Sequence, residues 1–435
     1  MDQRIPFRTL LMPYLVCFLA ALFYIYDYFI QVSPAVITSE LMRAFHIEAS
    51  GLSFLGACFF YSYASMQIPA GLLLDRFGAR RLLSFAILIS GIGVSLFGYT
   101  HDFMIAGLAR FFIGFGSAFA FISALFLATH WFEHRYFALI AGLVQLGGCL
   151  GSVLGEAPLA HVMNAYGWRH TLLMTGGITL VLALLYWLII RDYPPGKHAP
   201  PRQKMAIDKE WQRLKHIFSI PQVWWISLCG FFSWIPVATF GALWGVPYLM
   251  KVFEWRNTQA AAFCSIFWVA LGLSSVFIGW WSNHIEKRKL PAILCFIAGL
   301  AGSILMMLAP YLPVAILVFA LVLLGSSAAI QSLTFALIKD ILPEHLFGTA
   351  SGFVNMMAII AGGVSQQVAG LLLGLSWDHT FQAGSPLYHT HNYQQAMLML
   401  PCASLIGLII AYFKLKETNC QPLSETPPQV EMISS

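Results

Sequence analysis

Long, uninterrupted apolar segments recur along the whole sequence and restrict its possible folds more than any other feature. Each runs for roughly 20 residues, the length that a helix needs to cross the hydrocarbon core of a bilayer. Backbone groups find no water there, so only helices or closed barrels can span it, and barrel strands would be shorter and alternate in polarity. Only 10% of the residues are charged, whereas soluble domains carry about 25%. The sequence therefore predicts an all-α integral membrane protein.

Charged residues and Pro/Gly clusters divide the chain into twelve candidate spans. The spans cover 10–32, 50–71, 82–100, 103–129, 136–158 and 170–190 in the first half, and 221–250, 258–282, 290–309, 312–338, 347–376 and 393–413 in the second. We expect an N-terminal six-helix bundle at 1–190, an inter-bundle loop at 191–220, a C-terminal six-helix bundle at 221–414 and a tail at 415–435.

Basic residues are distributed unevenly over the predicted loops. Nineteen of the 24 Lys and Arg residues lie on the side of the N-terminus, four lie on the other side, and Arg110 lies inside a span. Cytoplasmic loops carry the excess of Lys and Arg in membrane proteins. We therefore expect a multi-pass protein of the bacterial cytoplasmic (inner) membrane with both termini in the cytoplasm. The net charge of +5 follows from this bias and gives no reason to expect a nucleic-acid partner.

The two halves of the chain share a weak internal repeat. The loop after the second span contains Gly71, Asp75, Arg80 and Arg81, and the loop after the eighth contains Gly279, Asn283, Arg288 and Lys289, at a constant offset of 208. A second similarity relates Gly116-Ser-Ala to Gly325-Ser-Ser. Repeats of this kind predict parallel structural halves, related by a pseudo-twofold axis along the membrane normal, with a cavity between them.

The first of these loops carries a recognisable signature. Its pattern of Gly71, Asp75, Arg76, Gly78, Arg80 and Arg81 resembles the cytoplasmic motif of the major facilitator superfamily, and Arg110-x-x-x-Gly114-x-Gly116 resembles that family's second motif. The resemblance implies twelve transmembrane helices arranged as two six-helix bundles. It also implies that the loop is a cytoplasmic gating motif, which latches one conformation through its charges. The alternative is that its arginines only determine topology.

Three ionisable residues are expected at membrane depth, all in the first half: Asp27, Arg110 and Glu156. Such groups cost at least about 2.5–3.5 kcal/mol to insert, so they indicate function. The predicted topology puts Asp27 and Arg110 in the outer half of the bilayer and Glu156 nearer the external rim. Asp27 is a candidate proton carrier or ammonium ligand. Arg110 either pairs with it or binds a substrate carboxylate, and a static Asp27–Arg110 pair is the structural alternative.

Further candidate binding residues are polar or aromatic. Tyr24, Tyr28 and Gln31 are spaced to share one helical face with Asp27. The second half offers Trp244 and Tyr248 in span seven, which prolines and glycines interrupt, and Gln331 and Asn355 in spans ten and eleven. For each of the last two, an interhelical hydrogen bond is the favoured structural alternative to a ligand role.

These features predict a secondary active transporter that moves a small organic solute by alternating access, with proton-coupled import. The run Tyr26-Asp27-Tyr28-Phe29-x-Gln31-Val32-x-Pro34 is similar to that of the phagosomal nutrient permeases of intracellular bacteria and of lysosomal dipeptide transporters, which implies an amino acid, short peptide or similar nutrient. Span five lacks the Gly-Pro pair of the family's antiporters, which favours uptake or facilitation. The alternatives are an organic-anion or siderophore exporter and a non-transporting membrane sensor.

The partners expected are the solute, protons and the lipid bilayer. No enzyme signature is present, since the sequence contains no GxSxG, HExxH or P-loop pattern. We accordingly expect neither a cofactor nor a metal, and a monomeric protein.

Overall fold

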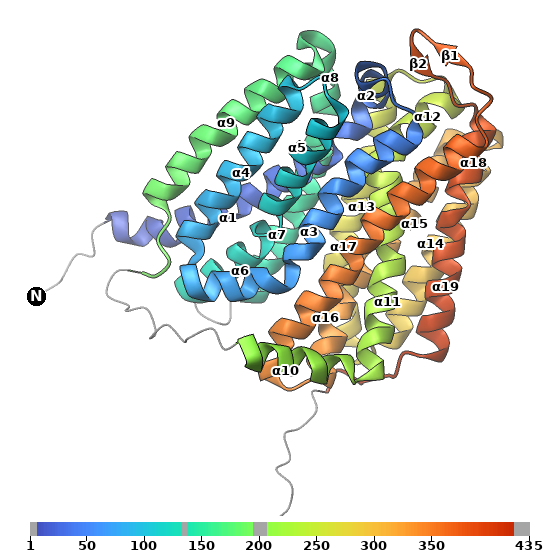
Figure 1. Cartoon of the computed structure of the whole chain (residues 1–435). Helices are drawn as coiled ribbons and strands as arrows, with labels where there is room; N and C mark the ends of the chain where they lie inside the picture. Colours follow the sequence, from blue (N-terminus) through green and yellow to red (C-terminus); the bar gives the residue numbers. More distant parts are fainter. Residues whose placement is uncertain (1–6, 133–136, 195–206, 422–435) are drawn as a thin grey trace, which may run out of the picture.

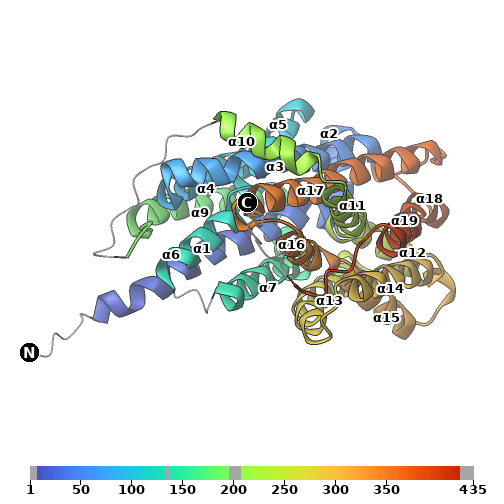
Figure 2. The ribbon, with the colours of Figure 1, turned by 90° about the horizontal axis from the view of Figure 1, so that it is seen from below.

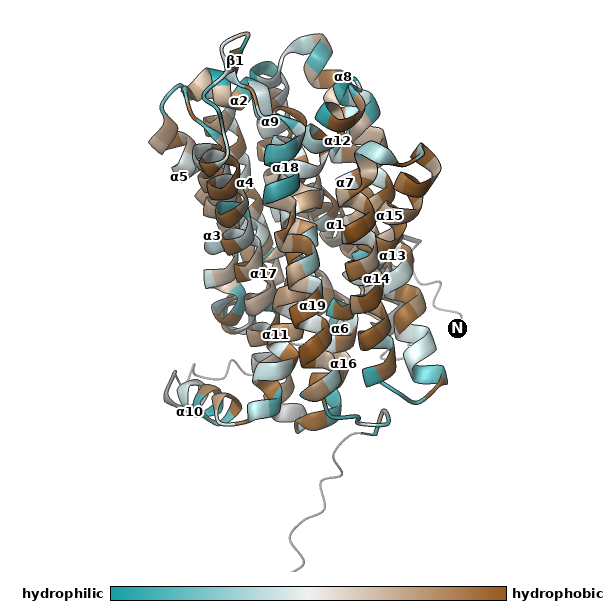
Figure 3. Cartoon of the chain, turned by 90° about the vertical axis from the view of Figure 1, so that its right-hand side faces the viewer, coloured by the Kyte–Doolittle hydropathy of each residue, from teal (hydrophilic) through white to brown (hydrophobic). Residues whose placement is uncertain are grey.

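The computed structural model describes residues 7–132, 137–194 and 207–421. Twelve helical segments within these ranges are long and apolar enough to cross a membrane. They form two bundles that stand side by side (Figures 1 and 2). Apolar residues cover the sides of the bundles, and hydrophilic residues gather at the two ends (Figure 3). Both observations agree with the spans and the fold expected from the sequence.

The first bundle contains α1 (Phe7–Val32), the 3-10 turn η1 (Ser33–Val36), α2 (Thr38–Phe45), α3 (Ala49–Phe77), α4 (Ala79–Tyr99), α5 (Phe103–Ser117), α6 (Ala120–Trp131), α7 (Phe137–Gly155), α8 (Ala157–Tyr166) and α9 (Trp168–Ile189). The connecting helix is α10 (Ile207–Phe218). The second bundle contains α11 (Pro221–Pro236), the π-helical segment η3 (Val237–Trp244), α12 (Gly245–Phe253), α13 (Asn257–His284), α14 (Lys289–Met307), η4 (Ala309–Tyr311), α15 (Val314–Ser327), α16 (Ile330–Ile341), α17 (Glu344–Leu375), the hairpin strands β1 (Phe381–Gln382) and β2 (Ser385–Pro386), α18 (Thr390–Met397) and α19 (Met399–Phe413).

The two ends of the molecule differ in structure. One end, which we call the hairpin face, carries α2, α8 and the β1–β2 hairpin (Figure 1). The opposite end, which we call the loop face, carries α10 and residues 415–421 (Figure 1). The bundles meet mainly where α3 packs on α17 and where α13 packs on α7 and α8.

Corresponding helices of the two bundles pack in the same way, as expected for a repeat. Spans four and ten are each broken at the same relative point, between α5 and α6 and between α15 and α16. A Cβ at Gly114 would lie 2.1 Å from the carbonyl oxygen of Phe59, and a Cβ at Gly325 would lie 2.2 Å from that of Phe267. Both glycines are therefore required for close helix contact, because any side chain would collide with the neighbouring backbone.

The seventh span changes its winding instead of breaking. Its central turns, η3, are π-helical and lie between α11 and α12. Such widened turns leave carbonyl groups without their usual partners. The side-chain amide of Gln366 on α17 donates to the carbonyl oxygen of Ala238 in this segment at 2.8 Å. The helix interruption predicted from Pro236 and the nearby glycines is therefore a local π distortion that α17 stabilises.

Candidate functional site

A cavity of about 520 Å³ lies between the bundles. The first bundle contributes residues of α3, α6 and α7 to its wall, and the second contributes residues of α10, α16 and α17. Apart from aliphatic residues and glycines, its lining consists of Gln67, Phe121, Arg213, Phe335, Phe347, Thr349, Ser351 and Asn355. Gly71 and Leu72 belong to the C-terminal turns of α3, and Arg213 belongs to α10, which lies on the loop face (Figure 1). The cavity therefore lies in the loop-face half of the molecule.

The hairpin face is held closed by hydrogen bonds between the bundles. The backbone N–H of Ala49 donates to the Tyr388 hydroxyl at 2.9 Å, and the Asn257 side chain donates to the carbonyl oxygen of Val36 at 2.7 Å. Deeper in the molecule, Trp244 Nε1 of η3 lies 3.3 Å from Ser53 Oγ of α3. The interface between the bundles is therefore closed at the hairpin face and hollow toward the loop face.

Asp27 lies inside the first bundle and is fully buried. Neither of its carboxylate oxygens has a hydrogen-bond partner among the described residues. The groups that act on it electrostatically are the Ser117 hydroxyl and the Arg110 guanidinium, both on α5. A charged carboxylate without donors is costly at this depth. Asp27 is therefore not turned toward lipid, and its surroundings suit a group that changes its protonation state.

Arg110 is also buried, with 1% of its surface exposed. Its Nε and Nη1 atoms lie 3.4 Å from the carbonyl oxygens of Leu55 and Ile30, and its guanidinium lies 5.0 Å from the centre of the Phe59 ring. No ion pair joins it to Asp27 within the described part of the chain. The static pair that the sequence left open is absent from this conformation, and Arg110 is not part of the cavity wall.

The polar face predicted on α1 divides between two environments. The Tyr24 hydroxyl lies 3.2 Å from that of Tyr28 and donates to Gln145 Oε1 on α7 at 3.1 Å, while the Tyr28 ring meets Trp268 of the second bundle. These tyrosines face the interface between the bundles, whereas Asp27 faces α5. Gln31, one turn further along α1, is buried, and its Nε2 has no partner among the described residues.

Two members of this cluster were not singled out from the sequence. Gln145 is the hydrogen-bond acceptor of Tyr24. Tyr63 of α3 lies within electrostatic reach of both Asp27 and Tyr28. Each is a polar residue within an apolar span, and this polarity was the only feature of the sequence that could have indicated a role. The packing of three helices brings the two residues together.

A chain of side-chain amides crosses the interface beside the cavity. Asn355 Nδ2 of α17 donates to Gln67 Oε1 of α3 at 2.6 Å, and Gln331 Nε2 of α16 donates to Asn355 Oδ1 at 3.2 Å. Gln67 Nε2 and Gln331 Oε1 are buried and have no partner in the described structure. The chain thus ends in a free donor on one side and a free acceptor on the other. Gln331 and Asn355 were expected from the sequence, and Gln67 was missed.

Span seven contributes to the hairpin-face half of the interface. Trp244 is fully buried and contacts the first bundle through Ser53. Tyr248, one turn later, donates to the carbonyl oxygen of Met306 within its own bundle and packs on Tyr393. Neither residue lines the cavity in this conformation. Glu156, between α7 and α8, is fully buried and hydrogen-bonds to α13 of the second bundle.

The signature loop between α3 and α4 contacts its own bundle. Gly78 forms the turn between α3 and α4 with a φ of +80°, a backbone conformation that glycine adopts more readily than other residues. The backbone N–H of Arg80 donates to Asp192 at 2.7 Å, and its Nε donates to the carbonyl oxygen of Trp187 at 2.8 Å. Gly71 lines the cavity, and a Cβ there would meet nothing within 4 Å. No neighbouring helix therefore approaches Gly71 closely in this conformation.

Two further members of the signature, Arg76 and Arg81, lie on the surface. The guanidinium of Arg76 lies 5.2 Å from the ring centre of its neighbour Phe77, and Arg81 is exposed. The side chain of Asp75 lies outside the described part of the structure, so its role in a latch stays a prediction.

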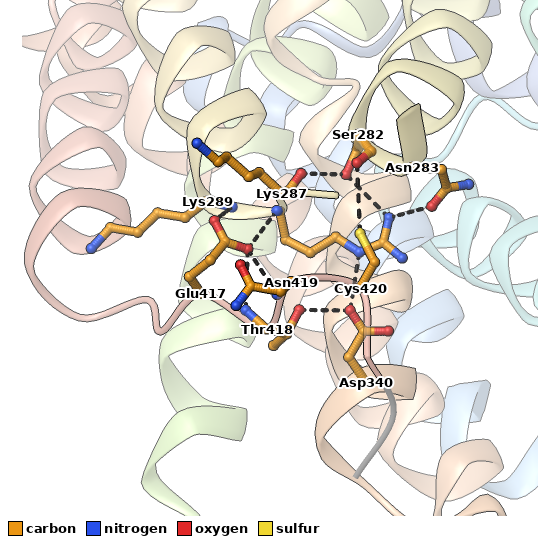
Figure 4. Close-up of polar contacts among 10 residues, drawn as sticks. Ser282, Asn283, Lys287, Lys289, Asp340, Glu417, Thr418, Asn419 and Cys420 are labelled. Atoms are coloured by element: carbon orange, nitrogen blue, oxygen red, sulfur yellow. Dashed lines mark hydrogen bonds and ion pairs between the residues drawn. The ribbon is translucent and has the colours of Figure 1, made fainter. Parts of the chain in front are cut away.

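The equivalent loop of the second bundle, between α13 and α14, makes more polar contacts (Figure 4). Arg288 forms a buried ion pair with Asp340 at 3.0 Å and donates to the side-chain oxygen of Asn283 at 2.7 Å. Glu417, after α19, accepts from the backbone N–H groups of Arg288 and Lys289 at the start of α14. A carboxylate following the last helix therefore stabilises the positive N-terminus of the third helix, as Asp192 does for α4 in the first bundle.

Loss of the buried Arg288–Asp340 pair is expected to destabilise the protein strongly. Asp340→Asn leaves a buried guanidinium without its counter-charge, which costs about 3–5 kcal/mol. The melting temperature of the purified protein should fall clearly below that of the wild type. Lys287→Ala is the control, because this neighbouring lysine is exposed. Equal melting temperatures for Asp340→Asn and Lys287→Ala would contradict the structural role of the pair.

A family model described as Major Facilitator Superfamily matches residues 17–366 and 229–425. The chain belongs to the major facilitator superfamily. It is 28% identical over 396 residues to a probable sulfoacetate transporter, SauU, of Cupriavidus necator, covering 86% of this chain and 89% of that protein. It is 23% identical over 395 residues to the lysosomal dipeptide transporter MFSD1 of Homo sapiens, covering 84% and 80%.

The superfamily fold is also found among solved structures. A bacterial homologue of the human lysosomal transporter Spinster, in an inward-facing and unoccupied conformation, superposes with a TM-score of 0.72 at 18% identity. The match covers 92% of this chain and 96% of that one. As a member of the superfamily, the chain is a multi-pass secondary transporter with a small-molecule solute, and not an enzyme.

Proposed function

We propose that this transporter imports a small organic solute together with protons. The solute carries a carboxylate and is an amino acid or a short peptide. It works by alternating access as a monomer in the bacterial cytoplasmic membrane, with the loop face and both termini in the cytoplasm. The excess of Lys and Arg on that side supports this orientation. The conformation described here is then the inward-facing one.

The observation that carries the solute class is the amide chain beside the cavity. The free N–H of Gln67 can donate to a carboxylate, and the Ser351 hydroxyl, which lines the cavity and has no partner among the described residues, can accept from an ammonium or peptide N–H. Asn355 holds the Gln67 amide in place across the interface, and Gln331 in turn holds Asn355. A zwitterionic solute satisfies both Gln67 and Ser351. The dipeptide transported by the relative MFSD1 has this chemistry, and the sulfoacetate of SauU shares its carboxylate.

We assign proton coupling to Asp27, with Arg110 as its alternating counter-charge. In the described conformation the Asp27 carboxylate has no donor, and Arg110 is held by backbone carbonyls instead. Loss of the proton from Asp27 would draw the guanidinium toward it. Tyr24 and Tyr28 connect this pair to the interface, and Gln31 lies on the same face of α1 one turn further along. Trp244 belongs to the part of the interface that opens in the outward-facing state, and Tyr248 supports it from within the second bundle.

Uptake into proteoliposomes with an imposed pH gradient tests the proposal. Accumulation of an amino acid or dipeptide driven by acid outside is the expected result. Organic-anion efflux is the second candidate, favoured by the presence of Arg213 in the cavity wall and by the sulfoacetate relative. Outward movement of a dicarboxylate or sulfocarboxylate, with no uptake of amino acids or peptides, would replace the first candidate by the second.

Substitution of Asn355 is expected to weaken solute binding without loss of the fold. Asn355→Leu removes the hydrogen bond that positions the Gln67 amide in the cavity wall. Loss of one such bond costs about 0.5–1.5 kcal/mol, which corresponds to about a 2- to 12-fold rise in the half-saturating solute concentration. Gln367→Leu is the matched control, because this amide on the same helix is exposed and donates nothing to the cavity. An unchanged half-saturation in Asn355→Leu would remove the amide chain from the binding site.

A further inference from the structure

A buried carboxylate lies at the junction of α7 and α8, outside the cavity and away from Asp27. Glu156 is fully buried, and Pro158 follows it within the first turn of α8. Because proline lacks an N–H and its ring clashes with the preceding turn, the helix cannot run on regularly through this point. Gly155 packs directly against α1, where a Cβ would lie 2.6 Å from the carbonyl oxygen of Phe29. The Glu156 side chain is directed at the second bundle.

Both hydrogen-bond partners of Glu156 come from α13. Ser265 Oγ lies 2.7 Å from Oε2, and Trp268 Nε1 donates to Oε1 at 3.1 Å. Ser265 and Trp268 are three residues apart and share one helical face. Opening of the hairpin face must separate α7 and α8 from α13, so it must break both bonds.

The geometry accommodates a proton on Oε2 of Glu156 with every group satisfied. Ser265 Oγ is also 3.0 Å from the carbonyl oxygen of Ala261. A protonated Glu156 donates to Ser265, which then donates its only proton to Ala261, while Trp268 still donates to Oε1. In the ionised form the hydroxyl must turn to Glu156, and a negative charge stays in the apolar interface with two donors and no cation.

Among the described residues, the elements around Glu156 supply no compensating positive charge. The titratable groups close to it are the Cys264 thiol on α13 and, beyond Trp268, the Tyr28 phenol on α1. On α9, which packs on α8, Arg169 donates to the carbonyl oxygens of Gly98 and Thr100. His161, on α8 itself, is exposed. An ionised Glu156 is thus unfavourable while the hairpin face is closed.

We infer that Glu156 is a second proton-binding site, which takes up a proton as the hairpin face closes and releases it when that face opens to water. The inference rests on the proposed alternating access and extends it from the central coupling residue to the gate. In the closed state the proton bridges the bundles through Ser265 and Trp268. In the open state water solvates the carboxylate, so alkaline conditions favour opening.

Distance measurements between spin labels on the purified full chain, without solute, test this site. Labels at Tyr99→Cys and Tyr311→Cys, in a background in which the exposed native Cys402 is replaced by serine, report the width of the hairpin face, because both positions are exposed, 73% and 80%, at its two sides. In the otherwise wild-type chain, the long-distance population should grow from acidic to alkaline buffer. In Glu156→Gln it should stay small in every buffer, since glutamine reproduces the protonated pattern, donating to Ser265 and accepting from Trp268.

Two controls define the outcome. Glu254→Gln, an exposed acid of the second bundle near the same face, should keep the wild-type pH response. Thermal unfolding should find Glu156→Gln at least as stable as the wild type, which excludes misfolding as the cause. A pH response that persists in Glu156→Gln, or is absent from the wild type, would overturn the inference. Failure of solute uptake with the pH response intact would instead count against the proposed function alone.

Discussion

Asp27→Asn is expected to abolish proton-driven accumulation of solute and to leave solute exchange intact. Asparagine is close in size to aspartate and stays neutral, so the transport cycle can continue without moving a proton. In the wild type, an ionised Asp27 at this depth costs at least about 2.5–3.5 kcal/mol, which protonation or approach of Arg110 must offset. Proteoliposomes with acid outside should therefore accumulate solute with the wild type, and only equilibrate it with Asp27→Asn. Counterflow should be similar in both.

The control for this experiment is an acid that cannot cycle a proton. Asp378 lies outside the spans, where hydrogen bonds from Thr380, and more weakly the neighbouring His389, hold its pKa below the ordinary value. It stays ionised throughout the pH range of the assay, so Asp378→Asn should accumulate solute normally. Uphill uptake by Asp27→Asn at the wild-type level would remove the coupling role from Asp27.

A disulfide between the bundles is expected to stop transport completely and reversibly. The chain already carries Cys149 on α7, and a Cβ at Gly272 on α13 would lie 3.1 Å from its Cβ and 3.3 Å from its Sγ. Disulfides need Cβ atoms about 3.5–4.5 Å apart, so Gly272→Cys requires a helix shift of a few tenths of an ångström. Oxidation should join α7 to α13 and prevent the hairpin face from opening.

After oxidation of Gly272→Cys, the remaining uptake relative to the untreated variant should equal the fraction of chains that are still reduced. A reductant should restore full uptake. The double variant Cys149→Ser/Gly272→Cys has the same added side chain without a partner, so oxidant should leave its uptake unchanged. Full uptake by a completely cross-linked chain would mean that α7 and α13 never separate during transport. That result would contradict alternating access around this interface.

The helical architecture was predictable because its cause is local. Apolar runs long enough to span a bilayer fix the helices, and the shared pattern at Arg80 and Arg288 indicates two related bundles. The sequence predicted an inter-bundle loop at 191–220, whereas Ile207–Phe218 within it form the helix α10. Span seven was less predictable. Its proline and glycines marked an irregularity, but the π winding also depends on Gln366, more than a hundred residues away.

The sequence indicated which residues belong to the candidate site, but not which of them contact one another. Asp27, Arg110 and Glu156 are recognisable because charges are rare at membrane depth. Their partners depend on which helices face one another. Asp27 and Arg110 are not joined in this conformation, whereas Glu156 meets Ser265 of the other bundle. Gln67 had no sequence signal beyond its polarity, and its importance appears only with Asn355 beside it.

The central claim, that the two bundles alternate around the cavity, is tested most directly by measuring the width of both faces in one preparation. The label pair at Tyr99 and Tyr311 reports the hairpin face, and a second pair at Thr129 and Lys339, exposed at the ends of α6 and α16, reports the loop face. A pH change or solute that lengthens one distance should shorten the other. Two distances that stay constant, or that rise and fall together, would contradict alternating access.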